Sequence, residues 1–278
     1  MITLWPIYRL FNRVFAGFLL FLLVDYCYAQ SYVSGEDESY YKSYQDGWQS
    51  GDKSGRGFQE WILRAPQYDS AEEEQYAGFF IAESNRESDL GSFASKGKAF
   101  GIFANGTSFE ETVAFRAFDR PLGVGDVFSF RFKFSGFINK FERDSDKLSS
   151  VGFALRHTVE AYASSSIAKS RVFAFVILEG FSTYQIFDGS KRFNTRIFID
   201  PQGAEVGFRV NDSGYDIQII TLSDHTIYNL NNRSFAQLQL ANEDQNLSPL
   251  ALRGFAFFNL NGGANNAYFN ALQLSSNE

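Results

Sequence analysis

The sequence contains little cysteine, methionine, proline or histidine. Its 278 residues include one Cys, one Met, five Pro and two His. The single cysteine, Cys27, lies in an apolar N-terminal segment, so the rest of the chain has neither a disulfide nor a thiol nucleophile. With no cluster of His and Cys residues, the sequence also argues against a zinc centre. A chain without these cross-links depends on its apolar core, and a folded part of about 250 residues is large enough to form one.

Basic residues and long apolar runs are also scarce. The chain has 25 Lys and Arg against 32 Asp and Glu, a net charge of -7 and a pI near 5.0, which argues against nucleic acid as a partner. The main apolar run, Val14–Val24, is shorter than the roughly 20 residues of a membrane span. Arg9 and Arg13 precede it, and Cys27-Tyr28-Ala29 provides small residues for a signal peptidase. Residues 1–29 are therefore predicted to be a signal peptide.

An uncleaved N-terminal anchor is the alternative to cleavage before Gln30. After cleavage we expect no membrane contact. The absence of cysteine from the mature chain favours a bacterial exported protein, located in the periplasm, at the cell surface or outside the cell. Residues 30–46 are rich in Ser, Tyr, Glu and Asp, and they are interpreted as a flexible leader or a loosely attached first strand. Residues 47–276 are predicted to be the folded domain.

Aromatic residues are abundant, with 32 Phe among 18% aromatic residues. The stretch Val127–Phe134 reads VFSFRFKF, so four phenylalanines alternate with polar residues. Successive side chains of a strand point to opposite faces, and one face of this strand would be purely aromatic. Such a face must be covered, most simply by a second sheet.

Short apolar or alternating stretches with turn residues between them recur along the whole chain. None reads as a helix of more than two turns, and the many short strands that are expected favour two stacked antiparallel sheets. Asn105-Gly106 and Asp188-Gly189 are predicted to be hairpin turns. The predicted strands are 58–63, 78–82, 99–105, 111–118, 127–134, 151–156, 171–178, 184–187, 192–199, 205–210, 215–222, 226–230, 234–240, 254–259 and 268–274.

Several motifs resemble a group of exported bacterial jelly-roll domains. They lie at Gly47–Asp52 (GWQSGD), Gly57–Trp61 (GFQEW), Lys98–Asn105 (KAFGIFAN), Gly125–Phe130 (GDVFSF) and Phe257–Leu272 (FFNLNGGANNAYFNAL). This group is similar to the concanavalin A-like lectin and glucanase superfamily, which includes laminin-G-like modules. The resemblance implies an all-β, two-sheet jelly-roll sandwich, and it supplies no catalytic residues.

Catalysis has weak support in the sequence. Retaining glycosidases need two carboxylates about 5–5.5 Å apart, and the E-x-D-x-x-E strand of the glucanases is missing. Glu36–Glu38, Glu72–Glu74 and the pair Asp144 and Asp146 are interpreted as solvated acids. A polysaccharide lyase would need a basic cleft, whereas His157 and His225 are interpreted as surface residues. We therefore lean away from an enzyme but keep a glycoside hydrolase or a polysaccharide lyase as alternatives.

No cofactor is predicted, although calcium is left open. Asn211, Asp212 and Asp216 surround a turn, and Asn259 and Asn261 surround another, so either set has the oxygen ligands that calcium prefers. The simpler interpretation of both sets is turn chemistry, in which Asn and Asp bond their own backbone.

Glycan binding is the function that the sequence favours. Sugars are held by exposed aromatic rings together with amides and carboxylates, and loops or strand ends usually carry such groups. The predicted ligand-binding residues are Trp48, Tyr184, Asp212, Tyr215, Asp216 and Tyr228, whereas Trp61 is predicted to be in the core. The expected partner is a polysaccharide or a cell-envelope glycan. A protein-contacting module of the cell envelope is a further alternative, and it predicts a flat, exposed apolar patch.

Overall fold

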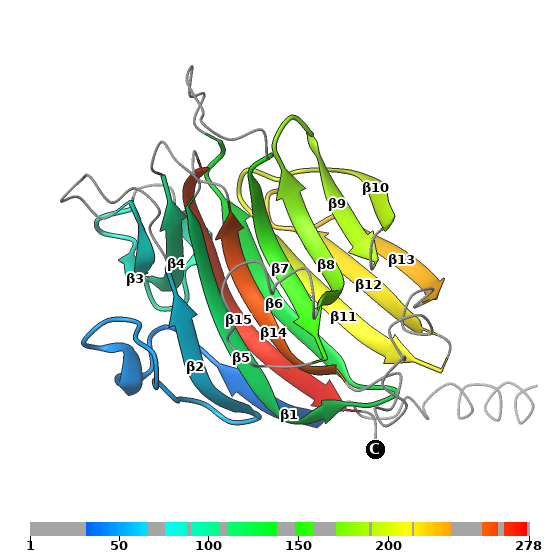
Figure 1. Cartoon of the computed structure of the whole chain (residues 1–278), viewed down its shortest axis with the longest axis horizontal. Helices are drawn as coiled ribbons and strands as arrows, with labels where there is room; N and C mark the ends of the chain where they lie inside the picture. The colour runs from blue at the N-terminus through cyan, green and yellow to red at the C-terminus, as the bar shows by residue number, and fades with distance from the viewer. Residues whose placement is uncertain are drawn as a thin grey trace, which may run out of the picture. The chain divides into compact units, whose positions relative to one another are not determined.

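The structure is a computed structural model of the whole chain (Figure 1). It describes residues 32–65, 76–87, 90–105, 110–137, 148–157, 171–188, 191–212, 214–234, 252–260 and 264–276. The predicted signal peptide, Glu72–Glu74, Asp144 and Asp146, the predicted strand 234–240 beyond Ser234, and Asn261 lie outside these residues. Among the helices of the described residues, none is long and apolar enough to cross a lipid bilayer.

Fifteen strands form two antiparallel sheets within the described residues, and Val33–Ser276 forms one compact unit. The first sheet has eight strands in the order β13-β12-β11-β6-β15-β4-β3, with β1 paired to β15. These strands are β1 (Tyr32–Asp37), β3 (Ala77–Glu83), β4 (Lys98–Ala104), β6 (Val127–Phe134), β11 (Ala204–Asn211), β12 (Gly214–Thr221), β13 (Ile227–Ser234) and β15 (Ala264–Ser276).

The second sheet has seven strands in the order β10-β9-β8-β7-β14-β5-β2 and lies over the first (Figure 1). Its strands are β2 (Phe58–Arg64), β5 (Glu111–Leu122), β7 (Ser150–Arg156), β8 (Arg171–Leu178), β9 (Thr183–Asp188), β10 (Lys191–Phe198) and β14 (Leu252–Leu260). Two short 3-10 turns, η1 (Lys42–Tyr44) and η2 (Gly91–Phe93), complete the described elements. The predicted all-β sandwich of two antiparallel sheets is confirmed.

One of the two predicted hairpins is wrong. The strands on either side of Asn105-Gly106, β4 and β5, belong to different sheets, because β4 pairs with β3 and β15 whereas β5 pairs with β2 and β14. Both strands are largely buried. Placing them in different sheets lets each one contribute apolar side chains to the core between the two layers. The hairpin around Asp188 is confirmed, since β9 and β10 pair directly.

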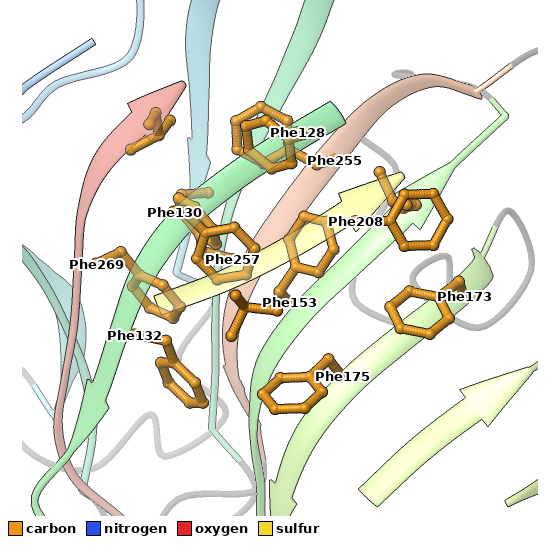
Figure 2. Packing of buried hydrophobic residues seen from close by; sticks show 14 of the residues in the cluster. Phe128, Phe130, Phe132, Phe153, Phe173, Phe175, Phe208, Phe255, Phe257 and Phe269 are labelled. Carbon is orange, nitrogen blue, oxygen red and sulfur yellow. The ribbon is translucent and has the colours of Figure 1, made fainter. Parts of the chain in front are cut away.

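Phenylalanine fills the space between the sheets (Figure 2). The four rings of β6 point inward and are at most 6% exposed, as their alternation predicts. Phe257 of β14 stacks on Phe269 of β15, with ring centroids 4.1 Å apart, so it joins the two layers directly. Trp61 is fully buried in the same cluster, which confirms its prediction as a core residue.

The segment 30–46 is not a free leader in its described part. Its strand β1 extends the first sheet along β15, and Tyr44 of η1 is buried in the core. Asp37, at the end of β1, is fully buried and forms an ion pair with Arg116 of β5 in the other sheet, so its interpretation as a solvated acid is wrong. The alternative of a first strand therefore describes this segment better than a flexible leader, and the packed chain begins before Gly47.

The two halves of the outer face of the first sheet differ. Over β15 and β4, Leu90 and Phe93 pack on Tyr268 and form a small second core. Over β6, β11, β12 and β13, most of the outward side chains are polar and partly or fully exposed, with Val127, Ile220 and Ile227 as apolar exceptions. This open half contains the candidate functional site.

Candidate functional site

A groove runs over β6, β11, β12 and β13 on the outer face of the first sheet. Its volume is about 270 Å³, close to the lower end of the range for small-molecule sites. Because strand residues alternate between faces, the same strands that send Phe128, Phe130 and Phe208 into the core present polar residues to this groove. The lining residues are Val127, Ser129, Glu205, Gly207, Arg209, Asp216, Ile217, Gln218, Ile220, Asn229 and Asn231.

A row of small and amide side chains crosses the groove from strand to strand. Gly207 of β11 pairs with Ser129 of β6 on one side and with Gln218 of β12 on the other. Gln218 in turn pairs with Asn229 of β13. These four residues therefore lie side by side in one register across four adjacent strands. We call them the polar row.

Larger side chains lie on both sides of the polar row. On β11, Glu205 and Arg209 are the neighbours of Gly207 on the same face, and each is about 7 Å along the strand. On β12, Asp216 and Ile220 occupy the corresponding places beside Gln218. The groove is thus bounded along the strands and continuous across them.

Gly207 forms the floor of the groove, and the backbone does not require a glycine there. Its φ angle is not in the left-handed region, and a Cβ atom would meet only Gln218, at 3.9 Å, which is ordinary van der Waals contact. Any longer side chain would project into the groove. The absence of a side chain at this position is what leaves the floor open.

The polar groups of the groove are held in place by one another. Gln218 Nε2 donates to Asn229 Oδ1 at 3.1 Å, and Asn211 Nδ2 donates to Asp216 Oδ1 at 3.3 Å. Glu205 lies 3.6 Å from Arg131 Nε in a half-exposed ion pair. The described lining contains two carboxylates, Glu205 and Asp216, and one cation, Arg209, so its net charge is small and negative.

Arg131 also faces a second acid at the margin of the covered half. Burial raises the pKa of Glu38, while hydrogen bonds with Ser95 and the backbone of Ala271, and the charge of Arg131, act against this. Glu38 Oε2 has no hydrogen-bond partner in the described structure. Glu38 does not line the groove, so we regard it as part of the support of Arg131 and not as a contact for a ligand.

The two lining carboxylates are not placed like a catalytic pair. Glu205 lies opposite Ile220, and Asp216 is four residues before Ile220 on β12. The backbones of Glu205 and Asp216 are therefore separated by about 13 Å along the strand direction. Retaining glycosidases need carboxyl groups about 5–5.5 Å apart and inverting ones about 6.5–9.5 Å. Both side chains also point outward from a rigid sheet and are tied to Arg131 and Asn211. The arrangement can offer hydrogen bonds to hydroxyl groups more readily than it can perform acid and base catalysis.

Three of the predicted aromatic platforms lie in the core. Trp48 is 4% exposed and packs on Trp61 and Phe100, with ring centroids 5.0 and 4.8 Å away. Tyr184 is 1% exposed, stacks on Phe175, and accepts a hydrogen bond from the backbone N–H of Asp200. Their rings are therefore covered by protein and cannot stack on a ligand from solvent.

Tyr215 is buried in the same way. It is fully buried, it stacks on Phe208, and its hydroxyl donates to Asp188 Oδ2 at 3.1 Å. Burial raises the pKa of Tyr215, and the neighbouring Asp188 carboxylate acts in the same direction. The alternation of side chains along β12 explains its position, because Tyr215 shares its face with Ile217 and Ile219, which are both core residues.

The other predicted site residues are on the surface, and one of them lines the groove. Asp216 is in the lining, whereas Asp212 is exposed beside the turn between β11 and β12. Tyr228 is 37% exposed and pairs with Ile219, so its ring lies on the core-facing side of the edge strand β13. Sequence reasoning missed Ser129, Glu205, Gly207, Gln218 and Asn229. Their signal was the polar face of strands whose other face is apolar.

The candidate calcium ligands that the structure describes lie in two places, around the turn between β11 and β12 and on β14. The described residues contain no group of three His, Cys, Asp or Glu side chains that could hold an ion. Asn211 and Asp216 bond each other, and Asn259 is buried and donates to the backbone carbonyl of Asn265. His225, the predicted surface histidine of the turn before β13, is exposed.

No protein-family model and no curated protein sequence matches the chain. Among solved structures, it is similar to the exoplasmic/lumenal domain of VIP36 in its Ca²⁺- and Man3GlcNAc-bound form, with 6% identity, a TM-score of 0.43 and coverage of 87% of this chain and 90% of that one. It is also similar to a legume lectin-like domain from Entamoeba histolytica, with 9% identity, a TM-score of 0.39 and coverage of 70% and 87%.

A third similar structure is a carbohydrate esterase from the Shiga toxin-encoding bacteriophage phi24B. It has 12% identity and a TM-score of 0.38, with coverage of 78% of this chain and 90% of that one. Likenesses with TM-scores below 0.5 do not bear on ligand or activity.

Proposed function

We propose that the protein is an exported, non-catalytic carbohydrate-binding β-sandwich, and that the groove on the outer face of its eight-stranded sheet holds a neutral glycan. The observation that supports this most strongly is the polar row with its open glycine floor. It places hydroxyl and amide groups at fixed positions on a rigid sheet, at a spacing that suits a ligand rich in hydroxyl groups. Export is inferred from the sequence of residues 1–29.

The charges of the groove favour a neutral glycan over an acidic one. Glu205 and Asp216 line the groove and Arg209 is its only cation in the described lining. The whole chain carries a net charge of -7. Sulfated or uronic acid chains would be repelled by this surface, whereas neutral hydroxyl groups can accept from amides and donate to carboxylates.

The alternatives receive less support from the described surface. A glycoside hydrolase would need paired carboxylates, and those of the groove are far apart. A polysaccharide lyase would need a basic cleft, whereas Arg209 is the one cation among the described lining residues. A protein-contacting module would need a broad apolar patch, whereas the large apolar side chains that are exposed lie on several different elements, such as Val124 in the turn before β6, Phe198 at the end of β10 and Ile227 on β13.

Filling the floor of the groove tests the proposal. Gly207→Leu should leave the fold intact, because the new Cβ meets only ordinary contacts, and should weaken glycan binding by roughly tenfold or more, ~1.4 kcal/mol. Binding would be measured by isothermal titration calorimetry and by retardation in gels containing a glucan, a mannan, a xylan or a galactan, with alginate as an acidic comparison.

Glu60→Leu is the matched control for this experiment. Glu60 is an exposed residue of β2 in the other sheet, so the same side chain is added to a strand surface away from the groove. The proposal expects the control to bind like the wild type and expects unchanged circular dichroism for both variants. The proposal fails if no neutral glycan binds, or if Gly207→Leu binds as tightly as Glu60→Leu.

A further inference from the structure

We infer that the ligand of this groove is a linear, unbranched oligosaccharide segment of about three sugar units that lies across the strands, over Gly207, from β6 to β13. This inference rests on the proposed function. It adds the direction, the length and the chemical class of the ligand. It also assigns Gly207 as the residue that determines specificity by leaving room for a sugar ring.

The direction follows from where the side chains block the sheet. Along β11, the nearest residues on the same face as Gly207 are Glu205 and Arg209, and each lies about 7 Å away. A chain that followed the strand would have to pass over both. Across the strands, the neighbours of Gly207 are Ser129 and Gln218, and neither is a charged side chain that forms a wall.

The length follows from the spacing of the strands. Ser129, Gly207, Gln218 and Asn229 lie on four adjacent strands, so the row spans three strand spacings, or about 14 Å. A pyranose unit in an extended chain advances by about one strand spacing, ~5 Å. About three units therefore match the polar row, and a monosaccharide would use only a part of it.

The class of ligand follows from the groups that remain free. Asn229 uses its carbonyl oxygen to accept from Gln218, which leaves its Nδ2 hydrogens and the Gln218 Oε1 atom for the ligand. At the other end, the Ser129 hydroxyl can donate and accept. The described lining contains no aromatic ring, so recognition depends on hydrogen bonds to hydroxyl groups and not on stacking.

A branch on the middle sugar unit would be sterically unfavourable. Glu205 and Arg209 flank the central position on β11, and Asp216 and Ile220 flank the next one on β12. A side branch at the middle sugar would have to displace one of these walls or leave the groove. An unbranched segment with free hydroxyl groups avoids both.

The test uses the full protein with cello-, manno- and xylo-oligosaccharides, from the monosaccharide to about the hexasaccharide, in calorimetric titrations. For the series that binds, affinity should rise with each unit up to about the trisaccharide and then level off. Asn229→Ala removes the last position of the row, so its affinity should level off one unit earlier. Glu60→Ala, on β2, is the matched control and should follow the wild type.

The direction is tested with a trisaccharide that has a nitroxide label at its reducing end. Broadening of backbone resonances that is strongest at β6 or at β13 and falls off toward the other strand supports the proposed direction. Broadening that is strongest at one end of β11 and falls off along that strand overturns it. A monosaccharide that binds as tightly as the trisaccharide, or an affinity that still rises at the hexasaccharide, overturns the inferred length while the proposed function stands. No binding by any neutral glycan contradicts the proposed function itself.

Discussion

Replacing Arg116 with methionine is expected to lower the free energy of unfolding by about 3–5 kcal/mol, because it leaves the Asp37 carboxyl buried without its cation. Arg116 and Asp37 are both fully buried. Their ion pair connects β1 of the first sheet to β5 of the second, so its loss should weaken the attachment of one sheet to the other.

The network around this pair explains why the effect should be large. Arg116 Nε donates to the carbonyl of Gln59 at 2.7 Å and Nη2 donates to that of Ser54 at 3.1 Å. Asp37 accepts from the Tyr44 hydroxyl at 2.5 Å and from the backbone N–H of Glu38 at 2.8 Å. The substitution therefore removes the donors of two carbonyls as well as the charge partner of the carboxylate.

The pH dependence of the variant has a definite sign. Burial raises the pKa of Asp37, and Arg116 is the strongest group acting against this rise. Without Arg116 the carboxyl should titrate still higher, so the folded variant binds more protons than the unfolded chain. The stability that this carboxyl contributes is then fully present below its ordinary pKa of about 3.8 and is lost as the pH rises through the raised pKa. The deficit relative to wild type should be smaller at about pH 5 than at about pH 8.

Urea denaturation followed by tryptophan fluorescence measures this effect. The double variant Asp37→Leu with Arg116→Met removes both charges, and it should recover about 1–3 kcal/mol of the loss. If the single variant is as stable as the wild type, or if the double variant is no better than the single one, the pair does not hold β1 to the sandwich.

Phe257→Ala is expected to cost a comparable 3–5 kcal/mol or so, because it opens a cavity at the point where the two sheets meet. Phe257 is fully buried. Its ring stacks on Phe269 at 4.1 Å and lies 5.2 Å from Phe130, so the substitution removes contacts to two strands of the opposite sheet (Figure 2).

The control for this substitution is Phe198→Ala. Phe198 is 73% exposed at the end of β10, so the same truncation there should change stability by less than about 0.5 kcal/mol. Phe257→Leu keeps most of the volume and should lie between the two. Similar midpoints for Phe257→Ala and Phe198→Ala in chemical denaturation would contradict the central position given to Phe257.

The sequence predicts the strands well because most have either one apolar face with period two, as in Val127–Phe134, or a continuous apolar run, as in Arg171–Leu178. Val127–Phe134 and Arg171–Leu178 were predicted with the bounds that the structure shows, and most other strands differ by one or two residues at their ends. Which strands pair with each other is harder to predict from the sequence. Asn105-Gly106 has the local chemistry of a hairpin, but whether β4 and β5 share a sheet is decided by packing far away in the sequence.

The candidate site was harder to predict because exposure of a ring cannot be read from its local sequence. Trp48, Tyr184 and Tyr215 stand near turns, where sugar-stacking rings are often found, yet in a core filled by Phe they serve as further packing residues. No local sequence pattern marks the residues of the polar row as a site. Its members come from four strands between Val127 and Ser234, and only the strand register brings them together.

The rigid sheet is what connects the core to the proposed function. The residues that alternate with the polar row, including Phe128, Phe130, Val206 and Phe208, are buried to 1% or less. Strands anchored in this way cannot shift without disturbing the packed rings, so the groove should be preformed. A preformed site loses little entropy on binding, which matters for a ligand recognised mainly through hydrogen bonds.

The most direct test of the groove as the glycan site is a ¹⁵N-labelled spectrum of the protein, titrated with the neutral trisaccharide that binds it. The account predicts that the largest shifts fall on the side-chain amides of Gln218 and Asn229 and on the backbone of Ser129 and Gly207. It also predicts that these shifts disappear in Gly207→Leu. Shifts concentrated away from β6, β11, β12 and β13, with the polar row unchanged, would contradict it.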